Sequence, residues 1–102
     1  MLALVVRIDL VSEEATATFD ALLAEMVGEV TANEPGALVY AVHTVDGEPL
    51  ARVLYEVYAD EAAFQAHQDA AYFKAFVAAR TPLMAQRRGE RLTVITAKGL
   101  DA

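Results

Sequence analysis

Apolar and polar residues alternate along the start of the chain in the way that is typical of a β-strand. Every second position from Leu2 to Leu10 is apolar, which predicts a strand over residues 2–10 with one face turned toward a core. The positions between them include Ala3 and Val5 as well as charged residues. Because this second face is half apolar, we expect the sheet to be covered on both sides.

A helical spacing follows the first strand. Ser12 is a favourable N-cap, and the two glutamates that follow it suit the first turn of a helix. Apolar residues then recur at every third or fourth position from Phe19 to Val30. The helix is predicted to end near Asn33, because the residue before Pro35 is disfavoured in helical backbone.

Two strands joined by a tight turn are predicted next, over residues 38–46 and 50–59. The sequence between the two apolar runs is a turn signal, since Gly47 is free to adopt a positive φ and Pro49 follows it closely. The two strands are therefore expected to pair as an antiparallel hairpin. Both faces of the strand over residues 38–46 are apolar, and the sheet of a partner subunit is the natural cover for one of them.

Helices return after the hairpin. Asp60 is expected to cap a short helix that reaches about His67, and a second helical piece begins near Asp69. Pro82 lacks a backbone N–H, so the second helix should break near Arg80 and restart for one more turn.

The last strand is expected over residues 91–98, after Gly89, which we interpret as a stop signal. The resulting order, βαββαβ, is that of a ferredoxin-like α+β fold, in which helices cover one face of an antiparallel sheet. Residues 1–102 are expected to form one domain. The open face of the sheet needs a second layer, which predicts a homodimer formed through that face.

Composition supports a protein partner and argues against nucleic acid. Hydrophobic residues make up 56% of the chain, against about 45–50% in typical domains, and large apolar surfaces usually mark interfaces. The net charge is −7, with 15 acidic and 8 basic residues, so a phosphate backbone would be repelled. The basic cluster formed by Arg87, Arg88 and Arg91 is expected near a helix C-terminus, where cations complement the helix dipole.

Several compartments and chemistries are disfavoured by what the sequence lacks. There is no cysteine, which excludes disulfides and thiolate chemistry. No apolar run reaches about 18 residues, so we expect no transmembrane helix and no membrane partner. The apolar N-terminus has neither the basic residues nor the cleavage site of a signal peptide, and a cytoplasmic location is expected.

Aromatic residues are concentrated around a single histidine, His67. Six of the eight aromatic residues lie between positions 55 and 76, in the predicted third strand and the helices after it. This concentration is typical either of the core of a small domain or of the wall of an apolar pocket that contains one titratable group. The six are Tyr55, Tyr58, Phe64, Tyr72, Phe73 and Phe76.

Two polar residues in this stretch are candidates for chemistry. His67 follows Phe64 by three positions, so both share the inner face of the short helix, and histidine can act as a general acid or base. The alternative is a hydrogen-bonded, inert histidine at a helix end, which spacing alone favours. Glu56 shares a strand face with Arg52 and Tyr58, and the favoured interpretation is a structural ion pair, with Arg52 on the same face or with Arg7 from another strand. The other possibility is a carboxyl group in a cavity with a raised pKa.

Recognisable cofactor and metal motifs are absent from the sequence. His43 and His67 are not spaced as metal ligands, and His43 is expected to have a surface or interface role. Glycine-rich nucleotide-binding motifs do not occur, and Ser12 is the only serine, which disfavours a catalytic triad. We therefore expect no cofactor and no bound metal.

Two motifs resemble those of a known family. The first is Asn33-Glu34-Pro35-Gly36 followed by Leu38 and Tyr40, and the second runs from Tyr55-Glu56 through Tyr58, Asp60, Ala63-Phe64 and His67 to Tyr72-Phe73-Lys74. In these motifs, and over nearly its whole length, the chain resembles the antibiotic biosynthesis monooxygenase superfamily. The resemblance implies a dimeric α+β barrel. It does not imply one reaction, because a fold does not fix a function.

The resemblance covers three groups of enzymes. One comprises cofactor-independent quinol monooxygenases, one an isomerase that degrades phosphorylated autoinducer-2, and one haem-degrading monooxygenases. The haem-degrading group uses an asparagine and a histidine where this chain has Arg7 and Val77, so that activity is disfavoured. In the other two groups a second histidine often follows the first by five positions, and here Tyr72 takes its place after His67.

The hypothesis we favour from this resemblance is a cofactor-independent monooxygenase that acts on a quinol or a related polycyclic phenol. In it, His67 moves the substrate proton, Tyr58 and Tyr72 orient the ring, Glu56 or Arg52 tunes the pocket, and Phe64 and Phe76 contact the ligand. One alternative is an isomerase of a small phosphorylated ketone, whose phosphate would meet Arg52 or Arg7. The other is a dimeric binding or stress-response module without catalysis, in which the aromatic cluster is only core.

Overall fold

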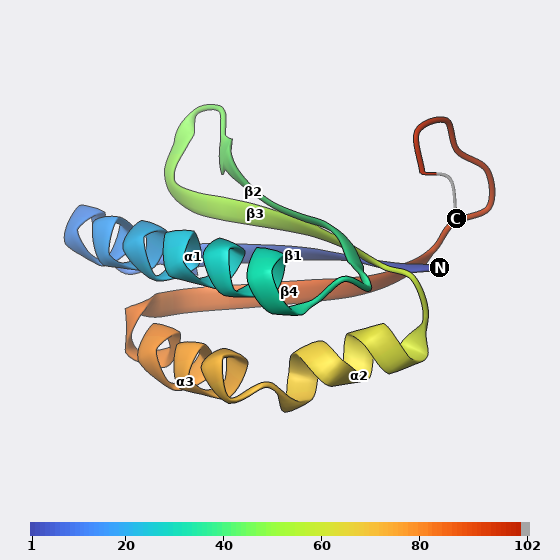
Figure 1. Cartoon of the computed structure of the whole chain (residues 1–102). Coiled ribbons are helices and arrows are strands. Elements are labelled where there is room, and N and C mark those ends of the chain that lie inside the picture. The colour runs from blue at the N-terminus through green and yellow to red at the C-terminus, as the bar shows by residue number, and fades with distance from the viewer. Residues whose placement is uncertain (101–102) are drawn as a thin grey trace.

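The computed structural model describes residues 1–100, which form one antiparallel sheet of four strands with three α-helices packed on one of its faces (Figure 1). The strands lie in the order β2-β3-β1-β4, so that the first and third strands of the chain are central. This is the ferredoxin-like arrangement that the sequence predicts. Along the chain the elements are β1 (Leu2–Leu10), α1 (Glu13–Asn33), β2 (Ala37–Val45), β3 (Glu48–Tyr58), α2 (Glu61–Asp69), α3 (Ala71–Arg80), the 3₁₀ turn η1 (Thr81–Leu83) and β4 (Met84–Thr93).

Helix boundaries are set by the residues that the sequence indicates. The hydroxyl of Ser12 accepts a hydrogen bond from the N–H of Ala15 at 3.0 Å, and the carboxylate of Asp60 accepts one from Ala63 at 2.8 Å. Both caps satisfy backbone donors that the first turn of a helix leaves without partners. α1 ends at Asn33, and Glu34 has left helical geometry because Pro35 follows it.

The core lies between the helices and one face of the sheet. Val6 and Ile8 of β1 and Leu54 of β3 point toward the helices and are buried against α1 and α3. Phe19 of α1 is fully buried, and its ring centroid lies 6.0 Å from that of Phe76 in α3. Part of the aromatic cluster is therefore core, and Phe76 belongs to that part.

A close approach at Gly36 brings the end of α1 against α2. A Cβ at position 36 would lie 2.6 Å from the Cβ of Ala63, nearer than real Cβ atoms approach. The carbonyl of Gly36 also accepts a hydrogen bond from the N–H of Ala59 at 2.9 Å, just before α2 begins. Glycine is needed here because the two backbones meet, and this contact holds Glu34 beside α2.

The prediction for the last strand was wrong in its position. β4 runs over Met84–Thr93, and Gly89 lies inside it, opposite Val6 of β1, rather than before it. The chain enters the strand directly after η1 because β1 offers backbone partners along its whole length, with one irregularity between Asp9 and Leu10, and this ladder outweighs the weak strand propensity of glycine. The basic cluster of Arg87, Arg88 and Arg91 is consequently in β4 and not at a helix C-terminus.

The face of the sheet away from the helices is largely apolar at its centre. Val5 on β1, Val39 on β2 and Tyr55 on β3 share this face and are only half-buried in the single chain. It is the surface through which the homodimer is predicted to form. None of the helices in residues 1–100 is long and apolar enough to cross a membrane.

Candidate functional site

A buried histidine and a buried carboxylate form the centre of the candidate site. His67 on α2 is 1% exposed, and Glu34, at the C-terminal end of α1, is 9% exposed. The Nδ1 atom of His67 lies 3.0 Å from each carboxylate oxygen of Glu34, and the hydroxyl of Tyr72 donates a hydrogen bond to the same carboxylate. Since a carboxylate only accepts hydrogen bonds, Nδ1 carries the proton, and in the neutral ring Nε2 keeps its lone pair.

Aromatic rings surround the imidazole of His67 on several sides. The ring centroids of Tyr40, Tyr58 and Phe73 lie 5.3, 5.6 and 4.5 Å from that of His67. The Nε2 atom is buried and has no hydrogen-bond partner within residues 1–100. Leaving a buried polar atom without a partner costs about 1–3 kcal/mol, so this orientation of the ring must be held by other contacts, chiefly the one with Glu34.

Glu56 is the second carboxyl group of the site. It is 6% exposed on β3, and the hydroxyl of Tyr58 donates a hydrogen bond to it at 2.6 Å. Burial raises the pKa of Glu56, and the hydrogen bond from Tyr58 opposes that rise. Burial, together with the nearby Glu56 charge, also raises the pKa of Tyr58, so that its hydroxyl stays protonated as a donor.

A small cavity of about 40 Å³ lies beside His67, between the sheet and the helices α2 and α3. A water molecule needs about 10–15 Å³ of such space, so the cavity is large enough for water or dioxygen but not for an aromatic ring. Arg87 is the exposed member of its lining. The residues that line it are Leu4, Val6, Tyr40, Leu54, Glu56, His67, Gln68, Phe73, Arg80 and Arg87.

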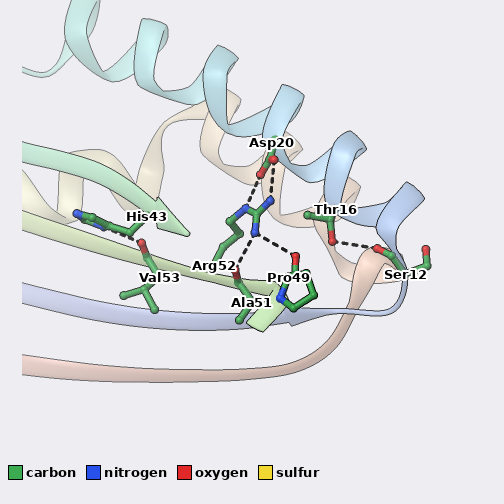
Figure 2. Close-up of polar contacts among 8 residues, drawn as sticks. All are labelled: Ser12, Thr16, Asp20, His43, Pro49, Ala51, Arg52 and Val53. Atoms are coloured by element: carbon green, nitrogen blue, oxygen red, sulfur yellow. Dashed lines mark hydrogen bonds and ion pairs between the residues drawn. The ribbon is translucent and has the colours of Figure 1, made fainter. Parts of the chain in front are cut away.

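The expectation that Arg52 pairs with Glu56 was wrong. Figure 2 shows the guanidinium of Arg52 reaching α1, where its Nε and Nη2 atoms donate to Asp20 at 2.8 and 3.0 Å. This hydrogen bonding raises the pKa of Arg52. Both residues line a surface groove of about 490 Å³ that also includes His43, which is exposed and hydrogen-bonded to the carbonyl of Val53. Strand alternation correctly placed Arg52 and Glu56 on one face of β3, but Arg52 lies at a different place along the strand from the candidate site.

The other predicted site residues fall into two groups. Tyr58, His67 and Tyr72 belong to one hydrogen-bonded and aromatic cluster, and Phe64 packs edge-on against Tyr58 with centroids 5.4 Å apart. Phe76 instead lines, with Tyr72, a groove of about 460 Å³ between α1 and α3. Of the seven predicted site residues, only His67 and Glu56 line the cavity, whereas Tyr58 and Tyr72 do not.

Glu34 is the residue of the candidate site that the sequence interpretation missed. It was considered only as the end of the first helix and as one residue of the motif Asn33-Glu34-Pro35-Gly36. A carboxylate at a helix C-terminus is electrostatically unfavourable, because the carbonyl groups there carry partial negative charge. That unfavourable placement is a signal that another group compensates for it, and the structure identifies this group as His67.

Metal-ligating residues do not cluster in the described part of the chain. Residues 1–100 contain no group of three or more His, Cys, Asp or Glu side chains that could hold a metal ion. The pair of His67 and Glu34 is instead suited to proton transfer, because the carboxylate fixes the tautomer and orientation of the imidazole.

The raised pKa of Glu56 predicts how Glu56→Gln changes the dependence of stability on pH. A carboxyl group whose pKa is higher in the folded state stabilises the fold at pH values below its unfolded pKa, and this contribution is lost as pH rises through the folded pKa. As pH rises from about 4.5 toward neutrality, we therefore expect the free energy of unfolding of the wild type to fall relative to that of Glu56→Gln. Urea unfolding of both proteins across this window measures the difference, with Glu14→Gln as an exposed control. Parallel pH profiles for wild type and Glu56→Gln would contradict the prediction.

Comparisons with known proteins connect this fold to one family. Residues 1–79 match the antibiotic biosynthesis monooxygenase family. A protein from Caulobacter crescentus assigned as an antibiotic biosynthesis monooxygenase has a similar structure, with 30% identity, a TM-score of 0.87, and coverage of 93% of this chain and 90% of its own. A similarly assigned protein from Bacteroides thetaiotaomicron has 25% identity, a TM-score of 0.87, and coverage of 99% and 94%.

A more distant structural neighbour is SnoaB of Streptomyces nogalater, a cofactor-independent oxygenase. It shares 19% identity with this chain at a TM-score of 0.81, with 94% of each chain covered, and at that identity the likeness concerns the fold alone. No curated protein sequence matches this chain closely enough to assign an activity by sequence.

Proposed function

This chain belongs to the antibiotic biosynthesis monooxygenase family, and from that membership we propose that it is a cofactor-independent monooxygenase of a quinol or a related aromatic phenol. The observation that carries the proposal is the Nε2 atom of His67, a buried base with a free lone pair beside a cavity. Glu34 holds the imidazole in the tautomer that leaves this nitrogen free. The description of SnoaB as a cofactor-independent oxygenase supports the same type of chemistry on this fold.

In the proposed reaction, Nε2 of His67 takes a proton from a substrate hydroxyl, and the electron pair left behind raises the electron density of the ring. A ring carbon next to the ionised oxygen gives electrons to dioxygen, a C–O bond forms, and the proton returns to give a hydroperoxide. Loss of water then breaks the O–O bond and leaves a carbonyl group. One hydroquinone and one dioxygen thus give one hydroxyquinone and one water, and all four electrons come from the substrate.

The size of the cavity restricts how the substrate is placed. An aromatic ring does not fit into about 40 Å³, whereas dioxygen does. We infer that the ring approaches past the exposed side chain of Arg87 and presents its hydroxyl to His67. Tyr72 and Tyr58 then act as positioning residues through Glu34 and Glu56 rather than by contact with the ring.

The remaining predicted residues have supporting roles in this proposal. Phe64 fixes Tyr58 by edge-on packing, and Phe76 anchors α3 to α1 through Phe19. The alternative isomerase would need Arg52 or Arg7 for a phosphate group, but Arg52 is paired with Asp20, and Arg7 is paired with Asp9 and Glu48. The binding-module alternative predicts no turnover with any phenol.

Oxygen consumption with a panel of quinols tests the proposed function. With 1,4-dihydroxynaphthalene and its ring-substituted relatives, we expect uptake above the rate of spontaneous oxidation and one atom of ¹⁸O in the hydroxyquinone product under ¹⁸O₂. The heat-unfolded protein at the same concentration is the control for uncatalysed oxidation. Uptake that never exceeds this control, with any member of the panel, would rule the proposal out.

We also propose that the functional unit is a homodimer formed through the open face of the sheet. The half-buried Val5, Val39 and Tyr55 on that face support the proposal, because a patch of this kind is costly to leave in water. Sedimentation at micromolar concentration is expected to give twice the mass of the 11.0 kDa chain. Tyr55→Arg is expected to shift the protein toward the monomer, and a monomeric wild type would contradict the proposal.

A further inference from the structure

Two arginines at the cavity differ from every other arginine of the chain. Arg7, Arg52, Arg88 and Arg91 each form an ion pair with an aspartate or a glutamate. Arg80 and Arg87 both line the cavity beside His67, and neither has a carboxylate partner within residues 1–100. Because the chain has 15 acidic and only 8 basic residues, a lack of available carboxylates does not explain this pattern.

Without an anion nearby, the charged side chain of Arg80 is in an unfavourable environment. Its guanidinium carbon lies 5.3 Å from the centroid of the Phe76 ring, and its Nε atom is buried without a hydrogen-bond partner in the described structure. Burial and the positive charge of Arg87 lower the pKa of Arg80. A bound anion would supply the acceptor that the Nε atom of Arg80 lacks. It would also offset the repulsion between the positive charges of Arg80 and Arg87.

Glu56 lines the same cavity and its charge acts on both arginines, but it makes no direct ion pair with either of them. Its carboxyl group is engaged by the hydroxyl of Tyr58, and its oxygens form no ion pair with Arg80 or Arg87 within 4.0 Å. Burial raises the pKa of Glu56, which weakens it further as a counter-ion. The two guanidinium groups are therefore left for an external anion next to the free nitrogen of His67.

We propose that Arg80 and Arg87 bind an ionised carboxylate of the substrate, so that the substrate is a hydroxylated aromatic acid. Planar guanidinium groups match a planar carboxylate through paired N–H donors, and three heavy atoms suit a cavity of about 40 Å³. The acid group enters between the arginines, and the hydroxyl of the same ring meets Nε2 of His67. This inference rests on the proposed function for the role of the ring, but the anion site is tested by binding alone.

Binding is measured with 1-hydroxy-2-naphthoate and its uncharged methyl ester, by fluorescence titration without oxygen. We expect the acid to bind at least about tenfold more tightly than the ester, the ratio that one charge-assisted contact provides. Arg87→Gln and Arg80→Gln should each remove this preference and leave ester binding unchanged. Arg88→Gln is the matched control, because Arg88 lies on the opposite face of β4 and pairs with Glu90. It should bind like wild type.

Each outcome decides the inference. Equal affinity of the wild type for acid and ester overturns it, as does a loss of preference in Arg88→Gln that equals the loss in Arg87→Gln. If inorganic phosphate displaces the acid more effectively than benzoate does, the site is one for phosphate esters and the carboxylate assignment is overturned. A preserved preference for the acid in protein that consumes no oxygen with the quinols or with their ring-carboxylated analogues would support the anion site while ruling out the monooxygenase.

Discussion

Replacement of His67 by alanine is expected to lower kcat for oxygen consumption by about 10²–10⁴-fold, the contribution that a positioned general base makes. The expectation follows from geometry, because His67 lines the cavity, its Nε2 atom has no hydrogen-bond partner among the described residues, and the ring is fixed by the two contacts between Nδ1 and Glu34. KM should change much less than kcat, since the histidine acts on the proton and contributes little of the apolar contact with the ring. Oxygen-electrode kinetics with a quinol identified in the panel measures both constants.

Added imidazole separates a chemical role of His67 from a structural one. The His67→Ala variant leaves a space beside Glu34 that imidazole fits, so millimolar imidazole should restore part of the lost rate. His67→Gln fills the same space and should not respond. His43→Ala removes the exposed histidine, whose ring contacts only the Val53 carbonyl among the described hydrogen bonds, and should keep the wild-type rate. A His67→Ala variant that is folded by circular dichroism and as active as wild type would falsify the base assignment.

Local sequence signals were enough to predict most of the fold. Ser12 and Asp60 cap the helices that the pattern indicates, and alternation from Leu2 to Leu10 gives the strand that lies at the centre of the sheet. These features depend on residues a few positions apart, for which periodicity and capping are strong determinants. The position of β4 could not be found in this way. Its register is set by pairing with β1, which is distant in the sequence, and Gly89 suggests a stop when it is considered alone.

The candidate site was only partly predictable for the same reason. Helical spacing placed His67 and Phe64 on one inner face, which the structure confirms. Pairing between charged residues, however, depends on distance in space. Arg52 and Glu56 share a strand face, but the side chain of Arg52 extends to Asp20 on α1, a residue that strand alternation does not bring into consideration. Glu34 reaches His67 only because Gly36 lets the end of α1 approach α2 closely.

The second large effect is expected from Glu34→Gln, which should lower kcat about 10²-fold with little change in KM. Glutamine has nearly the same shape as glutamate, so the packing of His67 against Phe73 and Tyr40 is retained. An amide both donates and accepts, however, so it no longer forces the proton onto Nδ1. The tautomer with the proton on Nε2 becomes populated, and in that tautomer the nitrogen at the cavity has no lone pair with which to accept the substrate proton.

Nitrogen NMR of the imidazole distinguishes this effect from a general loss of structure. In wild type the neutral His67 ring should show a protonated Nδ1 and an unprotonated Nε2, and in Glu34→Gln the two forms should be mixed. Glu34→Asp keeps the charge but shortens the side chain, so it should keep the wild-type tautomer, whereas Glu14→Gln, on the exposed first turn of α1, should change neither tautomer nor rate. A Glu34→Gln variant with full activity would mean that His67 does not depend on its carboxylate. The base would then have to be sought in Glu56, whose raised pKa makes its carboxylate a stronger base than an exposed one.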